Sequence, residues 1–313
     1  MTEWQLNTPV ALIIFNRPDT TQKVFDAIRQ AKPPMLLVIA DGHRLDKPED
    51  LEKCAATRAI IEQVDWRCQV LKNYADINLG CKKRVSSGLN WVFDTVEEAI
   101  ILEDDCLPHS TFFHFCEELL DYYRHDKRIM MISGDNFLFG QKRTEYSYYF
   151  SRYINIWGWA TWRRAWQYYD IEMDQWPKIR DGNWLQDIFC NSRTVYFWQK
   201  IFQSTYDDLI NTWDYQWVFA CWLQNSISVV PNVNLISNIG FDRDSTHTTE
   251  KASKASLIPT EQLMFPLNHP SFVICDTLAD NFVQNNFFSC NLLQRMQRRF
   301  KKLKSNNLFI KRE

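Results

Sequence analysis

The chain has 313 residues, of which 45% are hydrophobic and 15% aromatic, so it can bury a full core as one large domain or two smaller ones. This composition excludes a disordered polypeptide. The formal net charge is −2 at pH 7, but residues 291–313 carry about +7 and residues 1–290 therefore about −9, which argues against nucleic-acid binding by the acidic body.

Strand and helix patterns alternate through the first hundred residues. Apolar runs predict strands over 10–15, 35–40 and 69–72, and helical spacing predicts helices that begin near Asp19 and cover 48–64 and 82–93. A further apolar run over 99–102 predicts a fourth strand. This order predicts an α/β fold, a doubly wound and mostly parallel sheet with helices on both faces and right-handed crossovers.

The fourth predicted strand stops abruptly in Glu103, Asp104 and Asp105. Such a strand delivers carboxylates to the carboxyl edge of a parallel sheet, where open α/β sheets bind ligands. Mg²⁺ and Mn²⁺ prefer oxygen ligands and are often shared with substrate phosphates, so the pattern predicts a nucleotide-diphosphate site with Asp105 on the metal. We expect Glu103 and Asp105 to point to one side and Asp104 to the other. A helix-capping Asp before residues 110–113 is the alternative.

Three further groups fall near the same edge. Arg17 follows the first strand and has the forked guanidinium that suits a pyrophosphate, or it is a surface arginine. Asp41 follows the second strand and can accept a hydrogen bond from a base or ribose, or marks an Asp-Gly turn. Lys83 and Arg84 at a helix start bring charge and N–H groups to an anion, or form a solvated turn. We expect at most one group to contact ligand.

The second half of the chain is rich in tryptophan, which favours an acceptor site for sugar rings. Trp157 and Trp159 flank Gly158, which permits close approach of a ligand, although core packing explains most such tryptophans. Asp214 lies between tryptophans within residues 211–217, where apolar neighbours tune a carboxylate for proton transfer, so we interpret it as the catalytic base. Its alternative or additional role is the N-cap of a helix over 215–223.

The chain shows no run of roughly 20 apolar residues, the length that a membrane-spanning helix needs. Residues 291–313 mix basic with apolar residues, a pattern that predicts a helix lying on an anionic membrane surface, with a frayed terminus as the alternative. The nine cysteines lack a CxxC pair, which favours reduced thiols. The apolar run over 10–15 is too short for a signal peptide. We therefore expect a cytoplasmic protein, at most peripheral to the inner face of the membrane.

The order of these motifs resembles the GT-A glycosyltransferases, and more particularly the inverting family of animal N-acetylglucosaminyltransferase I and bacterial nucleotide-diphospho-sugar transferases of the family 2 type. The resemblance covers roughly residues 9–250. It rests on Asn-Arg-Pro at 16–18, Ala-Asp-Gly at 40–42, Asn-Leu-Gly at 78–80, Ile-Leu-Glu-Asp-Asp at 101–105, the aromatic run at 112–115, and the segments 132–136, 157–162 and 212–217.

The resemblance implies a role for each acid of the edge. Asp105 would coordinate Mn²⁺ that bridges the donor diphosphate, Glu103 and Asp104 would contact the donor ribose or sugar, and Asp41 would match the acid that reads uracil. It also implies a catalytic domain over 1–250, with a nucleotide half at 1–107 and an acceptor half at 108–250. Residues 251–290 and 291–313 then form an extension and a basic tail.

The late loop of such transferases often closes over the diphosphate or adds a metal ligand. By that resemblance we expect His247, in the polar stretch 240–248, to add a metal ligand and Arg243 to contact phosphate. The alternative is an ordinary solvated loop, which is the commoner state of a loop histidine.

These observations lead to the hypothesis that the protein is a Mn²⁺- or Mg²⁺-dependent inverting glycosyltransferase. It would transfer a hexosyl or N-acetylhexosaminyl group from a UDP-sugar to a glycan or lipid-linked glycan. Fold analogy suggests bacterial surface polysaccharide or lipopolysaccharide synthesis. A retaining transferase shares the fold and the metal. A sugar-1-phosphate nucleotidyltransferase is less favoured, because residues 15–19 lack the expected glycines. A non-catalytic carbohydrate-binding protein would explain the tryptophans without the acids.

Overall fold

The computed structural model describes residues 4–240 and 258–288. Its centre is an eight-stranded sheet in the order β3-β2-β1-β4-β8-β6-β9-β7, with a separate two-stranded pair of β10 and β5. The strands are β1 Val10–Ile14, β2 Met35–Ala40, β3 Gln69–Tyr74, β4 Glu98–Glu103, β5 Cys106–Pro108, β6 Ile129–Ser133, β7 Tyr148–Ser151, β8 Trp159–Trp162, β9 Ile227–Pro231 and β10 Ile236–Asn238.

The first half of the sheet is wholly parallel, as its apolar runs predict. β1 pairs with β2 on one side and with β4 on the other, and β3 adds to β2. Every residue of β1 is buried, which is typical of a parallel strand covered on both faces. Because these strands run in the same direction, their carboxyl ends lie along one edge, near Arg17, Asp41 and the acidic triplet.

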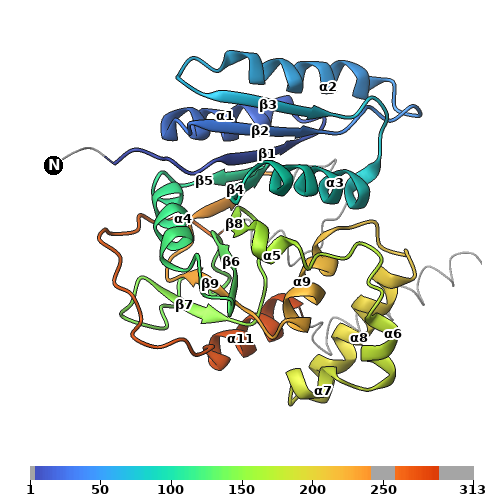
Figure 1. The fold of residues 1–313 in the computed structure, drawn as a ribbon, viewed down its shortest axis with the longest axis vertical. Helices are drawn as coiled ribbons and strands as arrows, with labels where there is room; N and C mark the ends of the chain where they lie inside the picture. Colours follow the sequence, from blue (N-terminus) through green and yellow to red (C-terminus); the bar gives the residue numbers. More distant parts are fainter. Residues whose placement is uncertain (1–3, 241–257, 289–313) are drawn as a thin grey trace, which may run out of the picture.

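Helices cover both faces of this parallel half (Figure 1). On one face Val10 and Leu12 of β1 pack in a core shared with α1 and α4, while Ala11 and Ile13 contribute to the opposite core with α3. The alternation of side chains along β1 therefore feeds two cores, and the predicted doubly wound arrangement is confirmed. The helices of this half are α1 Pro18–Ala31, α2 Glu49–Ile60 followed by the short turn Ile61–Gln63, α3 Gly80–Thr95 and α4 Thr111–Tyr122.

The second half of the sheet mixes strand directions. β8 lies antiparallel between β4 and β6, and β7 closes the far edge antiparallel to β9, whereas β6 and β9 are parallel. β9 ends at Pro231. In the turn that precedes β10, the Asn232 side chain donates to the Thr144 carbonyl and the Asn234 side chain donates to the Ile236 carbonyl.

An aromatic core joins this second half to its helices. Trp159 of β8 stacks on Trp213 with ring centroids 5.6 Å apart, and Trp217 of α9 packs beside them. These side chains are fully buried. The helices are α5 Arg163–Trp166, α6 Trp176–Asp181, α7 Leu185–Ile188, α8 Ser192–Tyr206, α9 Asp214–Leu223 and α11 Thr277–Val283, which continues into a π-helical turn at Gln284–Phe288. The aromatic core thus fixes where α9 begins.

Candidate functional site

The acidic triplet lies at the carboxyl end of β4, beside the segment that follows β1. Asp104 Oδ2 accepts a hydrogen bond from the Phe15 backbone N–H at 3.0 Å. Arg17 Nη1 donates to Asp105 Oδ2 at 2.6 Å and lies 3.9 Å from Asp104 Oδ1. Two chain segments that are distant in sequence are therefore joined by ionic contacts, as expected for neighbouring parallel strand ends.

The two aspartates do not alternate as expected. Both face Arg17, because β4 ends at Glu103 and residues 104 and 105 form a turn whose side chains no longer follow the strand pleat. The expectation that Asp104 points away from Asp105 is therefore wrong. The turn instead concentrates carboxylates around one guanidinium.

Crowding of these carboxylates in a buried position changes their acidity. Burial, followed by the charges of Asp105 and Asp104, raises the pKa of Glu103 to about 8. Burial and the charge of Asp105 raise the pKa of Asp104 to about 7, against the opposing effect of Arg17. Groups with such shifted acidity are typical of ligand-binding and catalytic sites, although ion-pair networks also show them.

Asp214, in the second half of the chain, lies close enough to Glu103 for its charge to act on that residue. Burial is the main cause of the raised pKa of Glu103 and of Cys81 at the start of α3, and the charge of Asp214 is a smaller cause in both cases. Asp214 is the first residue of α9, and the Thr212 hydroxyl donates to its carboxylate. The N-cap position belongs to Trp213, which makes no side-chain cap bond, so the capping interpretation of Asp214 is wrong.

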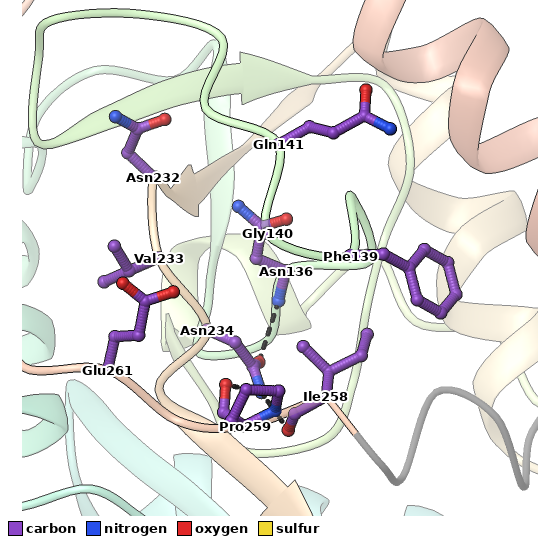
Figure 2. A pocket seen from close by; sticks show the side chains of 10 residues that line it. All are labelled: Asn136, Phe139, Gly140, Gln141, Asn232, Val233, Asn234, Ile258, Pro259 and Glu261. Atoms are coloured by element: carbon purple, nitrogen blue, oxygen red, sulfur yellow. Dashed lines mark hydrogen bonds between the residues drawn. The ribbon is translucent and has the colours of Figure 1, made fainter.

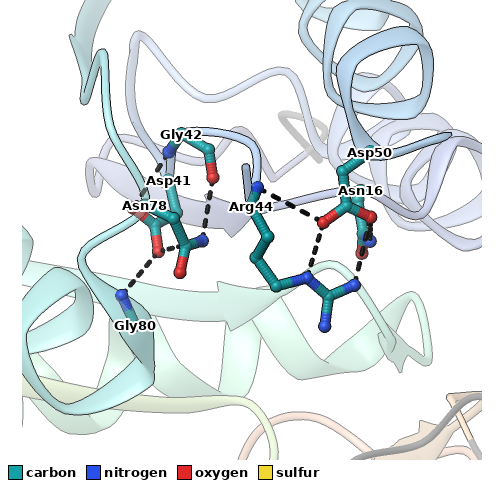
Figure 3. A network of polar contacts seen from close by, with 7 residues as sticks. All are labelled: Asn16, Asp41, Gly42, Arg44, Asp50, Asn78 and Gly80. Atoms are coloured by element: carbon teal, nitrogen blue, oxygen red, sulfur yellow. Dashed lines mark hydrogen bonds and ion pairs between the residues drawn. The ribbon is translucent and has the colours of Figure 1, made fainter. Parts of the chain in front are cut away.

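Asp41 is anchored to the loop that starts α3 (Figure 3). Its Oδ1 accepts from the N–H groups of Gly42 and Leu79 at 2.9 Å each, and its Oδ2 accepts from Asn78 Nδ2 and Gly80 N at 3.0 Å each. Gly80 has φ +77°, a conformation that favours glycine. Asp41 therefore shapes this loop, while the base-reading role that the resemblance implies stays a prediction.

A second network, also drawn in Figure 3, fixes the residue before Arg17. Arg44 donates to both carboxylate oxygens of Asp50, and Asn16 Nδ2 donates to Asp50 Oδ1 at 2.7 Å. Asp50 is fully buried, and its pKa is lowered chiefly by the hydrogen bond from Arg44. Sequence reasoning missed this anchor, because its three residues come from two separate loops and one helix without a motif spacing.

The basic cluster at the start of α3 divides into different roles. Arg84 is buried and donates to the backbone and side-chain oxygens of Asn73, and its expected contact with an anion stays a prediction. Lys82 pairs with Asp208 at 2.9 Å. Lys83 is exposed, and its proposed contact with a nucleotide remains a prediction.

The two tryptophans proposed for acceptor binding also differ. Trp159 is 1% exposed within the aromatic core, which favours a packing role, and its expected contact with a sugar stays a prediction. Trp157 is partly buried, with its backbone N–H donating to Asp135 Oδ2 at 3.0 Å and its ring against Phe137 at 5.1 Å. A role for Trp157 in acceptor binding stays a prediction.

The segment after β10 returns to the acid cluster. The Ile239 N–H donates to the Asp105 carbonyl at 2.8 Å. A Cβ added to Gly240 would lie 2.1 Å from Asp105 Oδ2, so only glycine permits this approach. The sequence signal was the glycine that opens the polar stretch 240–248. Arg243 and His247, predicted as phosphate and metal contacts, lie outside the described residues.

A divalent cation at the acid cluster stays a prediction. Asp105 would be its protein ligand, and donor phosphates and water would complete the coordination, the usual arrangement for Mg²⁺. Arg17 already pairs with Asp104 and Asp105, and a bound divalent ion would in addition favour the ionised forms of Glu103 and Asp104. Within residues 4–240 and 258–288 no group of three or more His, Cys, Asp or Glu side chains is arranged to hold a metal.

Comparison with known proteins leaves the family open. No family model matches the chain, and no curated protein matches it. Among solved structures, a cytidylyltransferase from Leptospira borgpetersenii shows 11% identity and a TM-score of 0.30 over 52% of this chain and 63% of its own. The 4-diphosphocytidyl-2C-methyl-D-erythritol synthase of Anaerococcus prevotii shows 11% identity and a TM-score of 0.30 over 50% and 71%. This chain thus spans less than two thirds of that cytidylyltransferase.

A UDP-glucose pyrophosphorylase in complex with UDP-glucose shows 12% identity and a TM-score of 0.26, over 47% of this chain and 62% of its own. Likeness at this level identifies neither a family nor an activity. In the part of the chain that the structure describes, the helices are too short or too polar to traverse a bilayer.

Proposed function

We propose that this protein is a metal-dependent inverting glycosyltransferase of the GT-A type that transfers a sugar from a UDP-sugar to a glycan or lipid-linked glycan. The observation that carries the proposal is the pairing of Arg17 with Asp104 and Asp105 at the carboxyl edge of the parallel half-sheet, with Asp214 close enough for its charge to contribute to the raised pKa of Glu103. That edge is where open α/β sheets bind ligands.

The donor half of the proposed site combines Arg17 with Asp105. The Arg17 side chain is 31% exposed, so its guanidinium is accessible to a diphosphate while Asp105 holds it in place. A guanidinium donates to phosphate oxygens in a fork, which orients as well as binds the group. A divalent ion, when bound at Asp105, supplies charge neutralisation for the departing nucleotide. Glu103 and Asp104 would then lie beside the donor sugar or ribose.

The acceptor half of the proposed site depends on Asp214. The start of α9 brings its carboxylate near Glu103 from a different chain segment than the one that carries Arg17. Single displacement with inversion needs a base that takes the proton of the acceptor hydroxyl on the side away from the leaving group. Asp214, oriented by the Thr212 hydroxyl, is our candidate for that base.

The decisive assay is a screen of UDP- and GDP-sugars for Mn²⁺-dependent cleavage, with Asp105→Ala as the control. We expect release of UDP that is lost in the control. Release of pyrophosphate from sugar-1-phosphate and nucleoside triphosphate would identify a nucleotidyltransferase instead. Retained anomeric configuration in the product, observed by NMR, would overturn the inverting assignment and the base role of Asp214.

We extend the proposal to the cell surface pathway that the sequence suggests. The basic, partly apolar composition of residues 291–313 supports peripheral contact with an anionic membrane at the cytoplasmic face. A lipid-linked acceptor for bacterial surface polysaccharide or lipopolysaccharide would be presented at that face. The measurement that tests this contact is vesicle binding by the full chain.

A further inference from the structure

A cavity of about 420 Å³ lies in the second half of the chain, apart from the acid cluster (Figure 2). Its volume falls in the range of small-molecule sites. Three segments form it: the loop after β6, the turn between β9 and β10, and the stretch that begins at Ile258. Its lining consists of Asn136, Phe139, Gly140, Gln141, Asn232, Val233, Asn234, Ile258, Pro259 and Glu261.

Two buried asparagines hold the walls of the cavity in place. Asn136 donates to the Pro231 carbonyl at 2.7 Å, and its backbone N–H donates to Asn234 Oδ1 at 3.1 Å. Asn234 Nδ2 donates to the carbonyls of Ile236 and Ile258 at 2.8 and 3.2 Å. These bonds tie all three segments together, so the cavity is preformed rather than a gap between loose loops.

The rim of the cavity carries an aromatic ring in an unfavourable backbone conformation. Phe139 has φ +52° and is 42% exposed, and Gly140 follows with φ +83°. The Phe139 ring lies against that of Phe282, with centroids 6.4 Å apart, and a bulky residue in the left-handed region costs free energy. Strain of this kind is concentrated at ligand-binding positions. The loop thus holds Phe139 beside the cavity at the cost of an unfavourable backbone conformation.

The charge of the lining selects the class of ligand. Among the lining residues there is no Lys, Arg or His, and the one charged side chain is Glu261. An anionic ligand such as a nucleotide or phosphate is therefore disfavoured here, in contrast to the site at Arg17. An apolar floor with an amide and a carboxylate at its border suits a neutral sugar, whose ring face packs on Phe139 while its hydroxyls donate to Glu261 and bond with Gln141.

We propose that this cavity binds a neutral oligosaccharide portion of the acceptor, an inference that rests on the proposed function of the acid cluster. The chain passes from Asn234 in the cavity wall through β10 to Gly240 at Asp105, a path that spans at most about 20 Å. An oligosaccharide of several units is the kind of ligand that can occupy the cavity and extend toward that cluster.

Saturation-transfer NMR on the full chain without donor tests this proposal. The probes are maltotriose, triacetylchitotriose and mannotriose at millimolar concentration, with the anionic trigalacturonate as the charged counterpart. We expect at least one neutral trisaccharide to bind and trigalacturonate not to. Phe139→Ala should weaken that binding about five- to tenfold, the contribution of one aromatic contact. Glu261→Gln should weaken it without affecting the fold.

Phe272→Ala is the matched control, because Phe272 is also an exposed phenylalanine but lies outside the cavity lining. It should leave the affinity unchanged. Binding of none of the three neutral probes, equal effects of both Phe variants, or preferential binding of trigalacturonate would overturn the proposal. The binding assay contains no donor, so its result is independent of the donor screen. If a trisaccharide binds here but the donor screen shows no UDP-sugar cleavage, the proposed activity is contradicted and the cavity is still a carbohydrate site.

Discussion

Arg17 Nη1 lies 2.6 Å from Asp105 Oδ2 and 3.9 Å from Asp104 Oδ1, so one guanidinium joins the end of β1 to the turn after β4. This contact makes the cluster both a structural joint and a candidate for binding diphosphate. Removing the Arg17 guanidinium leaves the neighbouring acids Glu103, Asp104 and Asp105 without its positive charge. A phosphate ligand would instead compete with these acids for Arg17. Stability and ligand binding at this position are therefore coupled.

The structural part of that coupling is testable with Arg17→Met. We expect this variant to lower the free energy of unfolding by about 1–3 kcal/mol at pH 7, because it strips a partner from partly buried carboxylates. The matched control is Arg29→Met, whose partner Asp65 forms an exposed pair and should cost less than about 1 kcal/mol. Urea unfolding measures both, and equal losses would contradict a special role for Arg17.

The catalytic role of Asp214 predicts a split between binding and transfer. Asp214→Asn should reduce the transfer rate by about 100-fold or more, because the base no longer accepts a proton, while UDP affinity changes little. Asp208→Asn is the control, since Asp208 is an exposed carboxylate that pairs with Lys82 at the start of α3. Parallel loss of UDP affinity and transfer in Asp214→Asn would remove it from the base role.

Asp41 should matter for stability through its four hydrogen bonds. Asp41→Ala leaves the N–H groups of Leu79 and Gly80 without their acceptor, so we expect a loss of about 2–4 kcal/mol in the free energy of unfolding. Asp46→Ala, on the exposed part of the same loop, should have little effect. Chemical denaturation compares the two. Similar small changes in both variants would show that the carboxylate does not hold this loop.

Asp135 predicts a pH dependence of stability that has nothing to do with ligand. Burial raises its pKa to about 8, against about 4 in an unfolded chain, so the folded state retains a proton that the unfolded state loses between these values. Stability therefore falls as pH rises from 5 to 7, by up to about 3 kcal/mol from this group alone. Asp135→Asn, which mimics the protonated acid, should remove that contribution. An unchanged pH profile would contradict a protonated Asp135.

The basic tail predicts binding of the full chain to anionic vesicles. Replacing Lys301 and Lys302 with Glu should weaken binding to phosphatidylglycerol vesicles about tenfold or more, because each basic residue near the surface contributes about 1 kcal/mol. The same change at the exposed Lys23 and Lys127 provides a control with equal net charge. Sedimentation of vesicles measures both. A matching decrease in the control would attribute binding to overall charge rather than to the tail.

The parallel half of the sheet could be predicted from sequence because its strands are continuous apolar runs. Such runs at β1, β2 and β4 identify fully buried parallel strands, and their ends then place Arg17 beside the acidic triplet without further information. The reversed strand β8 could not be predicted. Trp159 and Ala160 read as apolar residues in either direction, and the pairing of β8 with β4 depends on tertiary contacts.

Individual side-chain roles were less predictable, because burial of a polar or aromatic residue depends on partners that are distant in sequence. The sequence around Arg84 predicts a phosphate ligand, whereas the structure shows that Asn73 accepts its hydrogen bonds. The sequence around Trp159 predicts a ring that contacts a sugar, whereas in the structure Trp213 stacks on this ring. The cavity at Phe139 left no motif, since its walls come from three separate segments.

Calorimetric titration of UDP in the presence of Mn²⁺, on wild type and Asp105→Ala, tests the central claim most directly. The account predicts that UDP binds the wild-type protein and that Asp105→Ala weakens this binding by more than about tenfold. Glu261→Gln, in the separate cavity, should bind UDP like the wild type. Equal UDP affinity in wild type and Asp105→Ala would contradict the assignment of the acid cluster as the donor site.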